Sequence, residues 1–373
     1  MPLKPLNRSL MLPNRAKTLS LTLGVTILAW TALSAAAQAR LARVHSMDGR
    51  LQLKRMDWET FQPVSPGAAL YGDDLLLPDP GTTVVITCPN GRVSNNPPSP
   101  GLESSVNRAC PRTPRSDVKP SFGISEVWGG SDLAIPFMLT PRTDFVLDST
   151  PTLRWNPVPA AEEYTVTLTS FGEELWSLTT DQTTLPYPGH EPELMADGTP
   201  YELVVTADTG TASTNEDTGQ VFLRVVGDEV AEAEAEIAAV QAMDLPDDIK
   251  TLVLVEEVYP KYSLTGEAID ALLPLVDHGT ETVHIYRLLG DLYVKSGLQL
   301  PAEESYQTAI ELAKVEPNLE EETLAHLGLA TLYLEVNAPE KAKEALEQAQ
   351  LRATELGSAK LTDNIATQLS RLE

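Results

Sequence analysis

A pattern of large and small residues recurs three times in the last third of the chain, and it restricts how that region can fold. The clearest copy contains Tyr286, Leu289, Gly290, Tyr293, Ala302, Tyr306 and Ala309. The copy before it contains Leu252, Val255, Glu256, Tyr259, Ala268, Leu272 and Leu275. The copy after it contains His326, Leu329, Ala330, Tyr333, Ala342, Leu346 and Ala349. Small residues at set distances from bulky ones predict pairs of helices that touch where the small residues lie.

The three copies are unevenly spaced. The small-residue position advances by 34 residues from Glu256 to Gly290, and by 40 residues from Gly290 to Ala330. We therefore expect about six extra residues between helices, near 316–322. Glu256 replaces the small residue in the first copy, which places it either at the edge of the array or in its groove.

These spacings resemble the tetratricopeptide repeat, a family of helix pairs with a unit of 34 residues. The resemblance covers 249–373 and implies three stacked pairs with a concave face that takes up a peptide or a partner helix. The expected helices are 249–260 with 264–277, 281–296 with 299–314, 320–335 with 339–355, and a capping helix 361–372. The candidate groove residues are Glu257, Asp291, Lys295 and Glu335, for which a plain solvated charge is the alternative.

The first 39 residues have the pattern of a secretory signal peptide. Basic residues without any acidic residue precede an apolar run, which ends in the small-x-small sequence of residues 37–39. We expect cleavage after Ala39 and export to the periplasm or beyond the cell. The alternative is a retained anchor, because the apolar run approaches the length that spans a bilayer.

The charge balance excludes two classes of partner. The chain has 53 acidic and 27 basic residues, a net charge of −26. Nucleic acids and anionic membranes require a basic surface, so we expect neither to be a partner, and no membrane contact once the signal is removed. A basic protein partner fits this charge, although acidity can also be a bulk property of a proteome.

The chain has only two cysteines, Cys88 and Cys110. An exported chain meets oxidising conditions, so we predict one disulfide between them. We expect no metal site and no cofactor, because the histidines are scattered without ligand spacing.

Residues 40–135 predict a first β domain. Leu51 and Leu53 alternate with polar residues, and a stretch rich in β-branched residues ends near the turn Asn90-Gly91. Four short segments together resemble the FecR-type domain: Gly49 to Leu53, Phe61 to Val64, Gly72 to Leu75, and Val84 to Gly91. That resemblance implies a periplasmic domain that relays a signal. The Pro-rich loop 94–120 contains Arg108, Arg112 and Arg115, which suit a solvated loop or an anion contact.

Residues 136–227 predict a β-sandwich, because short alternating strands recur about every ten residues. Trp155 and the run Leu194, Gly198 and Tyr201 resemble fibronectin type III and immunoglobulin-like domains, in which such a tyrosine hydrogen-bonds back near the preceding loop. Trp155, Trp176 and Tyr187 fit the sandwich core, with an exposed carbohydrate platform as the alternative. A linker helix at 228–248 joins this domain to the repeats.

Together these segments predict two all-β domains followed by an all-α repeat solenoid, an order of modules that resembles exported proteins of cyanobacteria. The sequence has no nucleophile elbow, no zinc-protease motif and no phosphate loop. We therefore expect a non-enzymatic scaffold that binds a protein partner through the repeat groove. The alternatives are an envelope sensor or regulator of FecR type and a protein that binds carbohydrate or cell wall.

Overall fold

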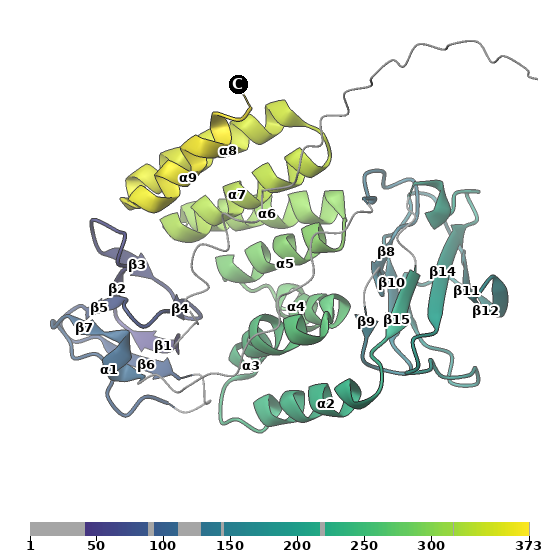
Figure 1. Ribbon diagram of the computed structural model, residues 1–373, viewed down its shortest axis with the longest axis horizontal. Coiled ribbons are helices and arrows are strands. Elements are labelled where there is room, and N and C mark those ends of the chain that lie inside the picture. Colours follow the sequence, from purple (N-terminus) through teal and green to yellow (C-terminus); the bar gives the residue numbers. More distant parts are fainter. Residues whose placement is uncertain are drawn as a thin grey trace, which may run out of the picture. The chain divides into compact units, whose positions relative to one another are not determined.

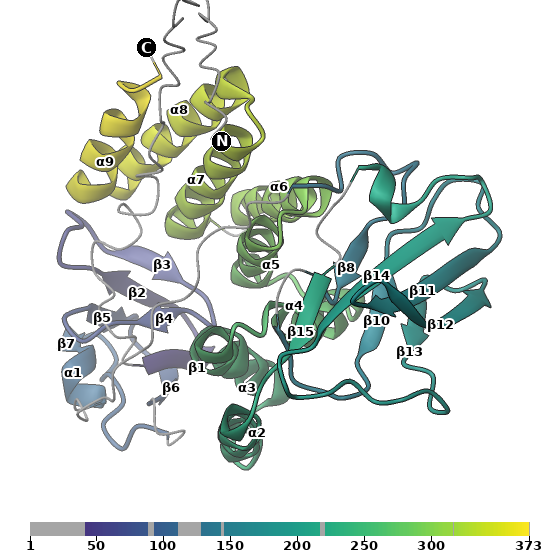
Figure 2. The same cartoon turned by 45° about the vertical axis from the view of Figure 1, so that its right-hand side comes forward.

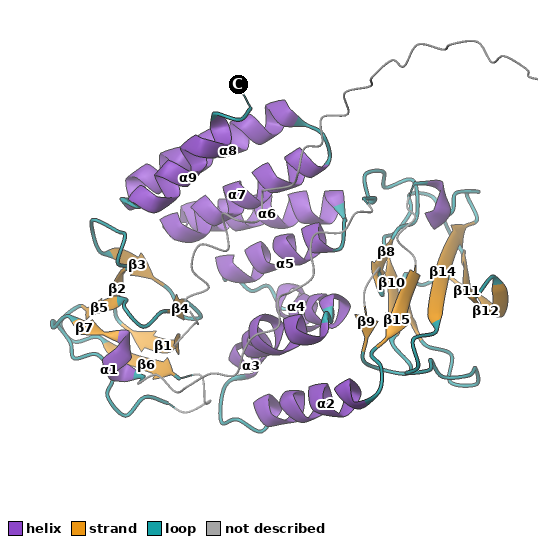
Figure 3. Ribbon diagram, in the orientation of Figure 1, coloured by secondary structure: helices purple, strands orange, loops and turns teal. Residues whose placement is uncertain are grey.

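The computed structural model describes residues 42–88, 93–110, 128–142, 145–216, 221–315 and 317–372. The expected signal peptide 1–39, the Asn90-Gly91 turn and the residues Arg112 and Arg115 lie outside them. Strands occupy the first part of this structure and helices the second, as Figure 3 shows. The predicted fold class, β domains followed by a helical array, is therefore confirmed.

The first β domain consists of two small sheets. Its elements are β1 (Ala42–Asp48), β2 (Leu51–Lys54), β3 (Gln62–Val64), β4 (Ala69–Leu70), β5 (Leu75–Pro78), β6 (Thr83–Thr87), β7 (Ser104–Ser105) and the short helix α1 (Val106–Ala109). One sheet has the order β4-β1-β6 and the other β3-β2-β5-β7. Alternating apolar residues such as Leu51 and Leu53 point inward and are buried, together with Leu76, Ile86 and Val106.

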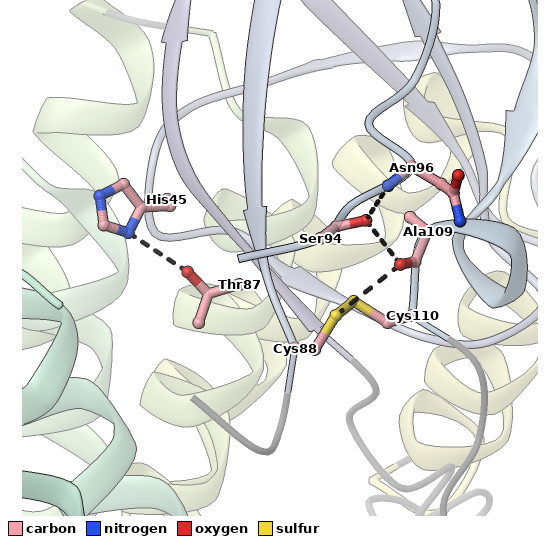
Figure 4. Close-up of a disulfide and its surroundings, with 7 residues drawn as sticks. All are labelled: His45, Thr87, Cys88, Ser94, Asn96, Ala109 and Cys110. Carbon is pink, nitrogen blue, oxygen red and sulfur yellow. Dashed lines mark hydrogen bonds between the residues drawn. A yellow bond between two sulfur atoms is a disulfide. The ribbon is translucent and has the colours of Figure 1, made fainter. Parts of the chain in front are cut away.

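The structure contains the expected disulfide. Cys88 follows β6 and Cys110 follows α1, and their Cα atoms lie 5.5 Å apart. Beside the bond, the hydroxyl of Ser94 donates to the carbonyl of Ala109 at 2.6 Å (Figure 4). A cross-link over a separation of 22 residues restricts the unfolded chain, which stabilises a domain of this kind by roughly 3 kcal/mol.

The sandwich places a five-stranded sheet, in the order β12-β11-β14-β15-β9, against a three-stranded sheet, in the order β13-β10-β8. Its strands are β8 (Met138–Thr140), β9 (Phe145–Val146), β10 (Thr152–Trp155), β11 (Tyr164–Ser170), β12 (Glu173–Thr180), β13 (Thr184–Pro186), β14 (Pro200–Ala207) and β15 (Val221–Arg224). Tyr201 makes the expected bond, because its hydroxyl accepts the backbone N–H of Met195 at 2.8 Å. Trp155 lies in the core with Leu168 and Phe222.

The helical region begins with α2 (Asp228–Gln241) and α3 (Asp247–Val253), followed by α4 (Thr265–Asp277), α5 (Val283–Lys295), α6 (Gln299–Val315), α7 (Leu319–Glu335), α8 (Pro339–Leu356) and α9 (Ala359–Leu369). In Figures 1 and 2, helices α5 to α9 follow one another in a stack. None of the helices in the described part of the chain has the length and apolarity needed to cross a bilayer.

The ring of Tyr306 is the centre of the helix packing. Its side chain is 1 % exposed. A Cβ atom at Gly290 on α5 would lie 2.5 Å from this ring, and one at Gly328 on α7 would lie closer still. Two helices can therefore meet α6 at this point only because both of these positions lack a side chain. The large and small residues of the sequence pattern are buried, except that Leu275, Tyr286 and His326 are half-buried.

Two expectations about the helices are wrong in detail. The expected single helix 249–260 is instead α3, followed by a π-helical segment (Leu254–Val258) and a 3₁₀ segment (Tyr259–Tyr262). The extra residues near 316–322 were expected to lie between helices. Most of them belong to α7 instead, because this helix begins at Leu319. Relative to its small residue Ala330, α7 starts about one turn earlier than α5 does relative to Gly290.

The sandwich contacts the helices through apolar residues such as Phe137 and Val225 and through polar groups. Arg154 pairs with Asp270 of α4 at 2.9 Å, and Glu267 of the same helix accepts the backbone N–H of Leu147 at 2.6 Å. The guanidinium of Arg142, which is buried, donates to the carbonyl of Ser296 at 2.6 Å. These bonds attach the sandwich to α4 and to the turn that follows α5.

Candidate functional site

A set of charged side chains lies where the first β domain meets the helical array, at the first helix of each repeat pair. We call it the charged cluster. Its members are Arg43, Arg55, Asp74, Glu256, His284, Arg287, Asp291, Glu320 and Glu321. Three of them come from the β domain and six from the helices. The cluster therefore joins parts of the chain that lie far apart in the sequence.

The guanidinium of Arg55 contacts two carboxylates and two aromatic rings. Its Nε and Nη2 atoms each donate to a different oxygen of Glu320, both at 2.7 Å, and Nη1 donates to Asp74 at 2.9 Å. The guanidinium also lies over the rings of Tyr71, 4.6 Å from the centroid, and Trp58, 5.3 Å from the centroid. A two-pronged pair of this kind fixes both distance and orientation. Burial raises the pKa of Asp74 to about 6, against the opposing effect of Arg55.

The first turn of α7 is built to present these carboxylates. Asn318 caps the helix, and its side chain accepts the backbone N–H of Glu321 at 3.2 Å. Acidic residues follow in the first turn, where the helix dipole favours negative charge. Glu320 reaches the β domain, whereas Glu321 turns toward α5. The extra turn of α7 therefore carries two members of the cluster.

Arg43 enters the cluster from β1. Its guanidinium donates to the carbonyl of Gly67 at 2.7 Å and pairs with Glu256. Both side chains are almost fully buried, at 4 % and 5 % exposure. Glu256, which occupies the small-residue position of the first repeat, therefore faces the first β domain. Removing either partner would leave a buried charge without compensation, which is costly.

His284 lies between two carboxylates. Its Nε2 atom is 3.1 Å from Glu256, and its Nδ1 atom is 2.9 Å from Glu321 and 3.0 Å from Nη2 of Arg287. Each ring nitrogen thus faces a carboxylate oxygen, to which it can donate when protonated, and Nδ1 also lies within reach of the Arg287 guanidinium. Burial lowers the pKa of His284 to about 4, against the opposing effect of Glu321.

Arg287 connects the cluster to the packing centre. It donates to Glu321 and to Asp291, both at 2.5 Å, and Asp291 accepts the hydroxyl of Tyr306 at 2.8 Å. Burial works against ionisation of Glu321, but Arg287 and His284 outweigh it and hold its pKa well below the usual range. A continuous chain of bonds thus runs from the β domain to the ring of Tyr306, on which α5 and α7 pack.

A cavity of about 250 Å³ opens beside the cluster. One wall is the β domain, with Trp58, Tyr71 and strand β3, and the other is the N-terminal ends of α5 and α7. The lining side chains Arg55, His284, Arg287, Glu320 and Glu321 are engaged in the bonds described above, and Gln62, Ser65, Glu281 and Thr282 also line it, so the cavity presents a mixed surface. In the described ranges, no three His, Cys, Asp or Glu side chains converge as metal ligands would.

The groove residues expected from sequence reach different places. Asp291 belongs to the charged cluster. Glu257 follows Glu256 in the π-helical segment, Lys295 is the last residue of α5, and Glu335 is the last residue of α7. All four are half-buried. Burial raises the pKa of Glu335, and the structure does not bring Glu335 into the cluster.

Sequence reasoning missed most of the cluster. The members not singled out as site residues were Arg43, Arg55, Asp74, His284, Arg287, Glu320 and Glu321. Two signals pointed to them: Glu256 at a position where the pattern requires a small residue, and the extra residues before the third repeat. A third signal was Arg43, a cation between the apolar residues Ala42 and Val44 at the start of β1, where all three residues are buried.

The aromatic residues considered for a carbohydrate platform are not exposed. Trp155, Trp176 and Tyr187 are buried in the sandwich core, at 1 %, 5 % and 7 % exposure. The indole N–H of Trp176 donates to the hydroxyl of Tyr187 at 3.2 Å. These three rings therefore belong to the core, and they cannot stack on a sugar from the surface.

We expect His284 to titrate near pH 4 in the native protein, as the proton signals of its imidazole in a nuclear magnetic resonance titration will show. Between pH 6.5 and 4, His284 binds a proton in the unfolded chain but not in the folded chain. Its contribution to stability is therefore complete above pH 6.5. It falls by about 3 kcal/mol as the pH drops to 4. Asp74 has the opposite effect on stability. Because its pKa is raised to about 6, its contribution is complete at low pH and is lost as the pH rises through 6.

The assignment and control for that titration use the same residue. Replacing His284 with glutamine removes its signal and leaves that of His326, whose pKa burial also lowers to about 4. In urea, the His284 signal should move to the ordinary value near 6.5. A native midpoint near 6.5 would show that His284 is not enclosed as described.

Comparisons with known proteins add little to this picture. No protein-family profile matches the chain, and no curated protein matches it. Among solved structures, it has a likeness to one titled "Crystal structure of MamA protein", with 21 % sequence identity and a TM-score of 0.28. That match covers 38 % of this chain and 81 % of the other. At this level the likeness carries no weight in assigning a function.

Proposed function

We propose that this chain is a non-enzymatic, exported scaffold that binds a protein partner through the inner face of its helical array. The observation that carries the proposal is the packing of α5 and α7 against Tyr306, which sets successive first helices side by side. Stacked helix pairs of this kind offer a long concave surface, which suits a peptide or a partner helix.

Three further features support the parts of this proposal. The Cys88–Cys110 disulfide suits a chain that works in an oxidising compartment. The net charge of −26 suits a basic partner, whose binding should weaken with added salt. The charged groups of the cluster are engaged with one another, which suits a structural role better than catalysis.

Site-specific crosslinking tests where the partner binds. A photoreactive residue at Lys295 or Glu335, at the C-terminal ends of the first helices, should capture one protein from envelope extracts. The same residue at Glu347, exposed on the second helix α8, is the matched control. We expect the captured protein to be basic, and to be released when salt is raised before irradiation. Equal capture at Glu347, or capture that salt leaves unchanged, contradicts the proposal.

A second candidate function is that of an envelope sensor in which the first β domain responds to the array. The bidentate contact between Arg55 and Glu320 favours it, because it couples the two parts directly. In that case, adding the captured partner should change amide hydrogen exchange in residues 42–88. Unchanged exchange there, with the partner bound, leaves the simple scaffold as the function.

A further inference from the structure

The helical array departs from the repeat pattern at two places, and each of them binds an arginine of the first β domain. Glu256, where a small residue is expected, pairs with Arg43. The extra turn of α7 carries Glu320, which binds Arg55 through two hydrogen bonds of 2.7 Å. Both departures also make bonds within the array, Glu256 to His284 and Glu321 to Arg287, but each one in addition reaches an arginine of the β domain.

We propose that these two departures form a docking site for the first β domain, and that the docked domain braces the array. Its two arginines reach the first repeat and the third repeat, which do not follow each other in the chain. The domain would thereby hold the separation between these repeats, and with it the curvature of the groove.

A third contact extends the brace to the capping helix. The hydroxyl of Ser358, the N-cap of α9, donates to Asp57 at 2.5 Å, and the backbone N–H of Glu59 donates to the carbonyl of Gly357 at 3.1 Å. Between them, Trp58 is 4 % exposed and belongs to the same apolar cluster as Leu356 at the end of α8. The interface therefore combines charged, backbone and apolar contacts.

The need for a brace follows from how repeat arrays are built. Each pair contacts only its neighbours, so small rotations between pairs add up along the array and change its curvature. A domain fixed at the π-helical segment, at α7 and at α9 adds a constraint across pairs that are not neighbours. Arg55 is oriented in advance by Asp74, Tyr71 and Trp58 of its own domain, so little order is lost when Glu320 binds it.

Hydrogen exchange of the full chain tests the brace. In Glu320→Ala, amides in residues 254–262 should exchange faster, although they lie in another repeat. Truncating one partner of a hydrogen-bonded charge pair should weaken docking roughly 30-fold, and exchange that needs undocking should speed up by the same factor. Glu322→Ala is the matched control, because Glu322 lies in the same turn but pairs with Arg352 of α8 at 3.0 Å.

The reciprocal variant gives an independent reading. Arg43→Met should speed up exchange in residues 319–323, which belong to the third repeat, whereas Arg43 pairs with Glu256 of the first. Exchange in residues 302–313 of α6 should stay unchanged in all variants, which shows that the array remains folded. If Glu320→Ala perturbs that helix, Arg55→Lys, which keeps the charge and loses the two-pronged geometry, replaces it in the comparison.

Acceleration confined to the turn that carries each substitution would overturn the brace, as would equal effects in Glu320→Ala and Glu322→Ala. The link between the brace and partner binding rests on the proposed function, but this experiment contains no partner. Its failure would leave the crosslinking result at Lys295 and Glu335 standing. Failure of the crosslinking would leave the exchange result standing.

Discussion

Replacing Tyr306 with alanine should destabilise the helical array by about 3–5 kcal/mol, because the ring is fully buried and both α5 and α7 pack on it. The helices can be followed by far-ultraviolet circular dichroism during urea unfolding. Trp155 and Trp176 lie in the sandwich core, whereas Trp58 packs with Leu356 of α8 and Trp128 packs against the helical core. In a background whose other tryptophans are phenylalanine, fluorescence therefore reports the sandwich separately. We expect the helical transition to move to lower urea while the fluorescence transition of the sandwich stays in place.

The two glycines that face this ring provide a sharper test. Gly290→Ala should cost about 1–3 kcal/mol in the wild-type protein, although alanine favours helix, because its Cβ overlaps Tyr306. In the Tyr306→Ala background the same change should stabilise the array, since the obstacle is gone and the helix preference of alanine remains. The sign of the effect of Gly290→Ala therefore depends on the residue at position 306.

Gly266→Ala is the control for this cycle. Gly266 is also helical, but its Cβ would lie 3.5 Å from the nearest side-chain atom, an ordinary contact. Alanine there should be neutral or stabilise by up to about 1 kcal/mol. If Gly290→Ala is as well tolerated as Gly266→Ala, the packing described around Tyr306 is wrong.

Glu321→Gln should destabilise the array by about 3–5 kcal/mol, because it leaves Arg287 with one carboxylate instead of two in a largely buried position. Glutamine keeps the shape of the side chain, so the loss reports the charge. The same change at Glu311, which is 73 % exposed and pairs with Lys314, should stay within about 0.5 kcal/mol. Equal effects at the two positions would show that the charged cluster contributes nothing specific to stability.

These two effects are linked through one hydrogen bond. The hydroxyl of Tyr306 donates to Asp291, which Arg287 also binds. Residues that share partners in this way do not act independently, so the losses from Tyr306→Ala and Glu321→Gln should not add. Combining them in one variant, by the same circular dichroism measurement, should show a smaller loss than the sum.

Periodicity made much of the fold predictable. The helices from α4 to α8 lie within a residue or two of the expected ranges, because large residues around Gly290 and Ala302 recur at helical spacing. The strands of the sandwich follow the alternation of residues such as Tyr164 and Val166. The first repeat was predicted less well, since neither Glu256 nor the π-helical segment that contains it follows the pattern.

The charged cluster could not be predicted in the same way. Arg55 and Glu320 are 265 positions apart in the sequence, and no local spacing relates them. In a chain with 53 acidic residues, each single glutamate also looks like a solvated charge. The partner of a charged side chain depends on which surfaces meet, and surface contacts between domains leave no period in the sequence.

The sequence by itself determined the order of the modules, the elements of the helical array, the disulfide and the buried rings of the sandwich. Each of these depends on local periodicity or, for the disulfide, on there being only two cysteines. Only the tertiary structure decided what the irregular positions do. Glu256 and the extra turn of α7 interrupt the repeat because they face another domain, where burial selects charged residues with complementary partners instead of small residues that let helices touch.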